Sequence, residues 1–186
     1  MKILTGKFRG KNFYMPANVR PSQNILRKAI FDILGHDLEG LRVLELFAGS
    51  GAVGLEALSL GAKEAVFVDH DPKCIEVIEK NVNLLFPEGY DSDQEWEIAP
   101  TDAFLAIKQL SNKNSKFDII FLDPPYLKEL AKKILNLLLA YDIVHANSFL
   151  VVQHDIRELL PDISQKFNLI KRKNYGKNCL TIFQAN

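Results

Sequence analysis

The chain has 186 residues, of which 47% are apolar and 25% charged, and its 23 basic and 23 acidic side chains cancel. This composition is ordinary for one globular domain, and no run approaches the roughly 18 consecutive apolar residues of a membrane span. The N-terminus shows no secretory signal pattern, and Cys74 and Cys179 stand alone without a CxxC pair or a histidine-rich tract. We therefore expect a cytoplasmic, reduced protein without a metal site.

Charge is distributed unevenly along the chain. Residues 1–31 contain no acid, residues 32–101 are strongly acidic, and a second basic group lies within residues 171–177. A basic cluster can bind a phosphate backbone, although a solvated surface shows the same pattern. The candidate contacts to a nucleic-acid backbone in the N-terminal group are Arg9, Lys11, Arg20 and Arg27.

The first 40 residues predict a small module with too little apolar surface to fold alone. Residues 2–14 alternate weakly and predict a β-hairpin with its turn near Arg9–Asn12. Ser22 is a suitable N-cap for a helix that ends at Gly35. We expect this module, residues 1–40, to pack on a domain formed by residues 41–186. The helix carries an apolar stripe that excludes Arg27 and consists of Ile25, Leu26, Ala29, Ile30, Ile33 and Leu34.

From residue 41 onward, apolar strand segments alternate with helical segments. Repeated β-α-β units predict a parallel sheet with helices on both faces, and a terminal hairpin would add antiparallel pairing. The predicted fold class is α/β, with a Rossmann-like, mostly parallel sheet of about seven strands. The expected strands are Arg42–Phe47, Glu64–Val68, Glu95–Ala99, Phe117–Leu122, Phe149–Gln153, Phe167–Lys173 and Cys179–Gln184, and the expected helices are Val53–Ser59, Pro72–Leu85, Ala103–Leu110 and Leu127–Leu139.

A glycine-rich turn follows the first of these strands. Gly49, Gly51 and Gly54 have the G-x-G-x-x-G spacing, and Asp69 lies 20 residues after Gly49. Small residues let the backbone approach a ligand, and a carboxylate at the end of the next strand can accept both ribose hydroxyls. The spacing suits a dinucleotide or another nucleotide-derived ligand, and a tight turn without a ligand remains an alternative.

Two acids favour S-adenosylmethionine over NAD as that ligand. Glu45 lies inside the first strand, where a carboxylate is costly unless a methionine ammonium or backbone N–H groups satisfy it. Asp102 follows the third strand and could accept from an adenine amino group, could cap the helix that begins at Ala103, or could do both. His70 could line the adenine pocket, but an ordinary loop histidine is the simpler interpretation.

The tetrapeptide Asp123-Pro124-Pro125-Tyr126 ends a buried strand at the edge where ligands bind in open α/β sheets. An exocyclic amine on a base is a poor nucleophile because its lone pair is delocalised into the ring. The Asp123 side chain and the Pro124 carbonyl can each accept one amine hydrogen and so direct the lone pair at a methyl group. Tyr126 offers a face on which a flipped base can stack.

These motifs resemble the class I methyltransferases with a D/N-P-P-Y/F motif and, more closely, the bacterial small-subunit (16S) rRNA guanine-N2 methyltransferases. The resemblance covers essentially the whole chain and includes Arg9-Gly10-Lys11 and Arg20-Pro21-Ser22. It departs at Asn24 and Ile25, where the family usually has Asp-Arg, and at Lys28, which replaces a usual acid. It implies catalysis at residues 123–126 and a methyl donor held by Glu45, Phe47, Gly49, Gly51, Asp69 and Asp102. Further candidate contacts to the donor are Ala48, His70 and Ala103.

We therefore expect a monomeric methyltransferase that uses S-adenosylmethionine to methylate a guanine N2 amine in ribosomal RNA or a small-subunit particle. Enzymes that methylate adenine N6, cytosine N4 or protein glutamine share the tetrapeptide, so the motif alone does not name guanine. An NAD-dependent oxidoreductase would explain the glycine turn but not the tetrapeptide. A catalytically silent RNA chaperone would leave the intact tetrapeptide without a role.

Overall fold

A computed structural model describes residues 1–17, 24–88, 90 and 92–186. Its centre is a seven-stranded sheet in the order β3-β2-β1-β4-β5-β7-β6. The first five strands pair in parallel, and β7 pairs antiparallel with both β5 and β6, as the expected terminal hairpin requires. The strands are β1 (Arg42–Leu46), β2 (Glu64–Asp69), β3 (Glu95–Pro100), β4 (Phe117–Leu122), β5 (Val144–Asp155), β6 (Phe167–Tyr175) and β7 (Asn178–Ala185). The predicted fold class is confirmed.

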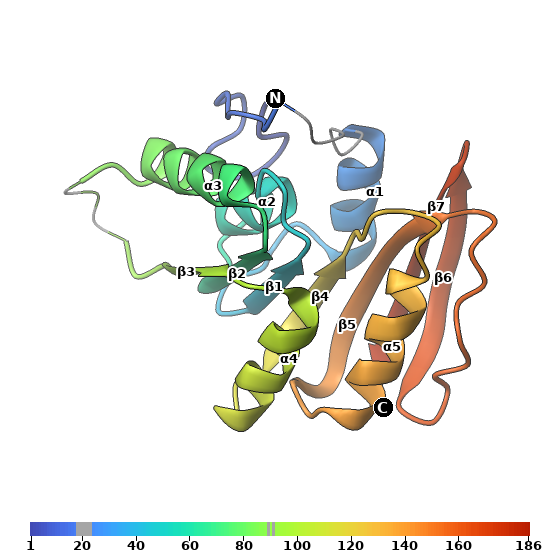
Figure 1. The fold of residues 1–186 in the computed structure, drawn as a ribbon. Helices are drawn as coiled ribbons and strands as arrows, with labels where there is room; N and C mark the ends of the chain where they lie inside the picture. Colours follow the sequence, from blue (N-terminus) through green and yellow to red (C-terminus); the bar gives the residue numbers. More distant parts are fainter. Residues whose placement is uncertain (18–23, 89, 91) are drawn as a thin grey trace.

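Helices cover both faces of this sheet (Figure 1). The helices are α1 (Asn24–Leu34), α2 (Ala52–Ser59), α3 (Pro72–Leu85), α4 (Ala103–Asn112) and α5 (Leu130–Ala140). Apolar side chains of α4 and α5 pack on one face with those of β1, β2, β4 and β5, whereas α1, α2 and α3 pack on the other face. Among the helices that the structure describes, none is long and apolar enough to cross a membrane.

One helix begins later than the sequence pattern predicts. The expected start was Leu127, but α5 begins at Leu130. Leu127 and Glu129 adopt positive φ angles of 59° and 54°, which a right-handed helix does not allow. The three residues before α5 therefore form a tight connection directly after the Asp-Pro-Pro-Tyr corner.

The N-terminal segment folds back on itself, although its turn lies earlier than predicted. The Ile3 N–H donates to Lys11 O and the Gly10 N–H donates to Ile3 O, both at 2.9 Å, so the connection spans residues 4–9 instead of Arg9–Asn12. Gly6 has a φ of 72°, and a Cβ there would lie 1.9 Å from Ser59 O. This contact packs the segment against the end of α2, while a domain boundary at residue 40 stays a prediction.

The buried stripe of α1 differs from the predicted one. Leu26, Arg27, Ile30 and Phe31 are buried, whereas the predicted stripe residue Ile25 is 59% exposed. The stripe includes Arg27 because Glu56 of α2 provides a buried partner, with Arg27 Nε 3.4 Å from Glu56 Oε2. The burial of Arg27 contradicts the prediction that it contacts RNA at the surface. Ser22, the predicted N-cap, lies outside the described residues, and so does Arg20.

Candidate active site

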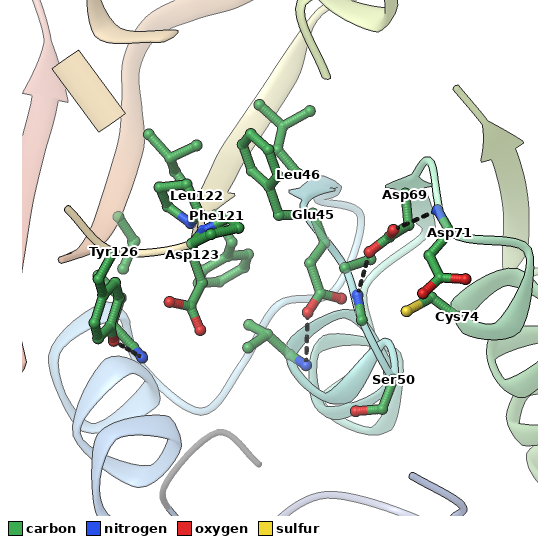
Figure 2. Close-up of a pocket in the computed structure, with 18 of the residues that line it drawn as sticks. Glu45, Leu46, Ser50, Asp69, Asp71, Cys74, Phe121, Leu122, Asp123 and Tyr126 are labelled. Carbon is green, nitrogen blue, oxygen red and sulfur yellow. Dashed lines mark hydrogen bonds between the residues drawn. The ribbon is translucent and has the colours of Figure 1, made fainter. Parts of the chain in front are cut away.

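A cavity of about 520 Å³ opens at the carboxyl ends of β1, β2, β4 and β5. The parallel strands place their terminal residues at one edge of the sheet, so motifs far apart in the sequence meet there. The glycine turn and Asp69 line one half of the cavity, and Asp123, Pro124, Pro125 and Tyr126 line the other. Figure 2 shows Asp123 between Tyr126 and Glu45, with Asp69 beyond Glu45.

The carboxylate of Glu45 joins β1 to the start of α2. It accepts hydrogen bonds from the backbone N–H groups of Val53, at 3.2 Å, and Gly54, at 2.8 Å. A Cβ at Gly54 would lie 2.3 Å from Phe67 Cε1 and 2.9 Å from Glu45 Oε2. Position 54 therefore needs glycine for this close approach of helix and strand. Of the two predicted ways to satisfy Glu45, the structure shows the backbone N–H groups.

Protonation of Glu45 is strongly perturbed by its surroundings. Burial raises the pKa of Glu45 to about 8, and the neighbouring negative charge of Asp123 adds to this rise. The two backbone N–H groups and the buried Arg27 oppose it without cancelling it. The charged form of Glu45 is therefore disfavoured in the site as it stands, and a cationic ligand beside Glu45 would favour that form.

Asp69 orders the two loops at the ends of β1 and β2. Its Oδ2 accepts from the Gly49 N–H at 2.8 Å, and its Oδ1 accepts from the Asp71 N–H at 3.0 Å (Figure 2). The side chain of His70 lines the cavity but is 71% exposed, with Nδ1 3.7 Å from Asp69 Oδ1. This loop is ordered in turn by Asp71, which caps α3 by accepting from the Lys73 N–H at 2.9 Å.

The tetrapeptide turns the chain out of the sheet directly after β4. All four of its residues line the cavity. The hydroxyl of Tyr126 accepts a 2.7 Å hydrogen bond from Nε2 of Gln153, a residue of β5 that also lines the cavity. This bond anchors the Tyr126 ring to the sheet, so the ring provides a wall of defined orientation for a planar group.

Three of the residues predicted to bind the methyl donor are not among those that line the cavity. Phe47, Ala48 and Gly49 line the cavity, but Gly51, Asp102 and Ala103 are not among its lining residues. Asp102 instead caps α4, accepting from the Phe104 N–H at 2.8 Å. A contact from Asp102 to a bound ligand stays a prediction, as do the donor-binding roles of Gly51 and Ala103.

Three residues that line the cavity belong to no sequence motif that indicates a binding site. Ile30 comes from α1, Gln153 from β5 and Asn178 from the start of β7. Their place in the cavity depends on the antiparallel pairing of β7 with β5 and on the docking of α1, neither of which a local motif encodes. Across the described part of the chain, no cluster of three or more His, Cys, Asp or Glu side chains could hold a metal ion.

Comparison with known proteins agrees with this architecture. The Bacillus subtilis protein YlbH, a candidate rRNA methyltransferase by its name, is 30% identical over 99% of this chain and 98% of its own length. Ribosomal RNA small subunit methyltransferase D of Escherichia coli is 26% identical over 99% of this chain and 89% of its own length. The solved structure of the E. coli protein yhhF, a methyltransferase candidate, has a TM-score of 0.83 and 26% identity, and the match covers 100% of this chain and 97% of that one.

A more distant neighbour shares the fold alone. The methyltransferase candidate SMU.776, solved in complex with S-adenosylhomocysteine, has a TM-score of 0.70 at 15% identity and matches 96% of this chain and 52% of its own.

The family model described as "Conserved hypothetical protein 95" matches residues 1–184, nearly the whole chain. The chain therefore belongs to this family, which agrees with its resemblance to the 16S rRNA guanine-N2 methyltransferases.

Proposed function

We propose that this protein transfers a methyl group from S-adenosylmethionine to the exocyclic N2 amine of a guanine in small-subunit ribosomal RNA. The observation that carries the proposal is that the glycine turn and the tetrapeptide at residues 123–126 line two halves of one cavity. Glu45 lies at the junction, hydrogen-bonded to the turn and electrostatically coupled to Asp123. This arrangement suits a reaction between two bound molecules.

The glycine-turn half fits a cationic nucleoside. A bound cation would favour the charged form of buried Glu45, Asp69 orders the backbone of the turn through the Gly49 N–H, and Gly49 itself lines the cavity. When bound, the donor supplies a methyl group whose bond to sulfur breaks as the amine nitrogen bonds to it, leaving S-adenosylhomocysteine. Glu45 and Asp69 would orient the donor and offset its positive charge.

The other half fits a flipped base. Asp123 and the Pro124 carbonyl would accept the two hydrogens of the amine, and Tyr126 would stack on the ring. The nitrogen releases its surplus proton after transfer, so the site needs only to position the amine and stabilise developing charge. Asp123 carries the one carboxylate of the tetrapeptide, and that proton can pass to it.

The proposed substrate draws on the relatives and on the surface. Methyltransferase D of E. coli acts, by its name, on small-subunit ribosomal RNA. Arg9 and Lys11 are exposed in the N-terminal segment, where they could contact a phosphate backbone. The choice of guanine rests on the family resemblance.

The test is tritiated-methyl transfer to small ribosomal subunits and to deproteinised RNA, followed by mass spectrometry of the nucleosides. We expect N2-methylguanosine from the wild-type protein. Asp123→Ala should lower kcat by at least about 100-fold because the amine loses an acceptor, while calorimetry should show that donor binding survives. Asp123→Asn, which keeps an acceptor oxygen, should retain more activity. Wild-type turnover by Asp123→Ala would refute the positioning role, and a methylated adenine or cytosine would refute the choice of base.

A further inference from the structure

Asn178 combines burial with an unsatisfied polar atom at the edge of the cavity. The residue is 2% exposed and lines the cavity. Among the residues that the structure describes, none donates a hydrogen bond to its Oδ1. Buried side-chain acceptors in folded proteins nearly always have a partner, and Asn178 lines the cavity, so a donor on a molecule bound there could satisfy this atom.

The position of Asn178 assigns it to the half of the cavity that faces the methyl acceptor. It is the first residue of β7 and pairs with Asp155 of β5. Paired residues of antiparallel strands project from the same face, and alternate residues of one strand do too, so Asn178 shares a face with Gln153. In the sheet order, β4 and β5 separate β7 from the glycine turn after β1. Asn178 is therefore placed on the Tyr126 side of the cavity.

The polar neighbours of Asn178 on β5 are already engaged. Gln153 donates its Nε2 to the Tyr126 hydroxyl at 2.7 Å. The Asp155 carboxylate accepts from the Arg157 guanidinium at 2.7 and 2.9 Å. The His154 ring lies 2.9 Å from the Thr181 hydroxyl and 2.9 Å from the Asp155 carbonyl. None of these contacts supplies a proton to Asn178.

The chemistry of the base edge identifies the missing donor. In guanine, the ring atom on one side of the exocyclic amine is N1, which carries a hydrogen. In adenine and cytosine, the ring nitrogen beside the exocyclic amine is N1 or N3, which carries a lone pair and no hydrogen. An acceptor placed beside the amine-binding corner would therefore favour guanine and repel the other two bases.

Building on the proposed function, we infer that Asn178 is a specificity-determining residue that accepts a hydrogen bond from N1–H of the target guanine through its side-chain oxygen. Asp123 and the Pro124 carbonyl hold the amine itself. Together these three groups read two adjacent positions of the Watson–Crick edge, as enzymes that act on flipped bases do. The residue sets the base preference and takes no part in donor binding.

The test uses 2-aminopurine, which keeps the amine of guanine but has a lone pair in place of the N1 hydrogen. Mass spectrometry first maps the methylated nucleotide in small subunits. Subunits are then reconstituted from RNA carrying guanine or 2-aminopurine at that position, and kcat/KM is measured for both. Asn178→Ala should lower kcat/KM for guanine by about 10- to 100-fold and should not lower that for 2-aminopurine, because the variant also removes the repulsion between the Asn178 oxygen and the lone pair on N1. The control is Asn174→Ala, an exposed asparagine on β6, which should change neither value.

The outcomes separate this inference from the proposed function. An equal loss on both substrates, or no loss on guanine, would overturn the role of Asn178 while wild-type methylation of guanine still supports the proposed function. Absence of methyl transfer to guanine by the wild-type protein would overturn both. Donor titration by calorimetry and a melting curve show whether Asn178→Ala is folded. If it is not, a wild-type preference for guanine below about 10-fold overturns the inference.

Discussion

Glu45 shows how a single residue can link the fold to the chemistry. Its carboxylate accepts hydrogen bonds from two backbone N–H groups in the first turn of α2, and Glu45 also lines the cavity. Its burial stabilises the protonated form, whereas a cationic donor stabilises the charged form. Binding of a cation beside Glu45 would therefore be coupled to proton release from this residue.

We predict that donor affinity depends on pH through Glu45. In the protein without ligand, the pKa of Glu45 is raised to about 8. A bound cation would lower this pKa, so donor binding below pH 8 should release a proton from Glu45. The affinity for S-adenosylmethionine should fall about tenfold per pH unit as pH decreases from 8, until the pKa of the complex is reached. Calorimetry in buffers of different ionisation enthalpy measures both the affinity and the proton release. Glu45→Gln should bind more weakly with little pH dependence, and a flat wild-type profile would contradict this coupling.

At the scale of elements, a buried ion pair joins three parts of the chain. Glu56 of α2 accepts from the backbone N–H groups of Leu4 and Thr5, at 3.0 and 2.5 Å. Arg27 of α1 lies against Glu56 and donates to the Lys2 carbonyl at 2.7 Å. Burial lowers the pKa of Arg27, and the charges of Glu56 and Glu45 oppose this effect. The pair holds the N-terminal segment on the side of the sheet that carries α1 and α2.

We predict that Arg27→Met destabilises the protein by about 3–5 kcal/mol because Glu56 then lacks its buried countercharge. Urea unfolding measures the change. The double variant Arg27→Met/Glu56→Gln should recover much of this loss, since the glutamine oxygen can still accept from residues 4 and 5. Lys28→Ala is the matched control, because Lys28 pairs with Asp32 at the surface and should leave stability nearly unchanged. A small effect of Arg27→Met would show that the pair is dispensable.

At the scale of the whole molecule, the exposed N-terminal cations are separate from the opposite helical layer. Arg9 and Lys11 lie in the segment that packs on α2, whereas the exposed Lys132 and Lys133 lie on α5 across the sheet (Figure 1). Lys11 Nζ lies 4.8 Å from the centre of the Phe8 ring, which holds this cation near the surface of the segment. Two surfaces with two lysines or arginines each can thus be compared directly.

If the N-terminal surface contacts RNA, Arg9→Ala/Lys11→Ala should weaken binding to small-subunit RNA and flatten its salt dependence. The slope of log K against log salt should decrease by about 0.7–0.9 for each phosphate contact removed. Filter binding at several salt concentrations measures this slope. Lys132→Ala/Lys133→Ala removes the same charge from the other face and should change the slope less. Equal slopes for the two double variants would assign Arg9 and Lys11 to a solvated surface.

Local sequence patterns predict the structure correctly wherever the pattern is periodic or the residues are chemically distinctive. Alternating apolar segments predict the five parallel strands, and the spacing of Gly49, Gly51, Gly54 and Asp69 predicts a ligand site at their carboxyl ends. The tetrapeptide was placed correctly at the cavity because prolines must leave a central strand. The predicted start of α5 at Leu127 is wrong, because the positive φ angles at Leu127 and Glu129 leave no periodic signal in the sequence.

The sequence by itself determined the order of strands and helices, the edge of the sheet that carries the site, and the Asp123–Tyr126 corner. Only the tertiary structure decided that Arg27 is buried and that Asn178 and Gln153 reach the cavity. The physical reason is that strand patterns and turns arise from neighbouring residues, which the sequence displays directly. Burial of a charge depends instead on a partner such as Glu56, 29 residues away, and the cavity wall depends on which strand β7 pairs with.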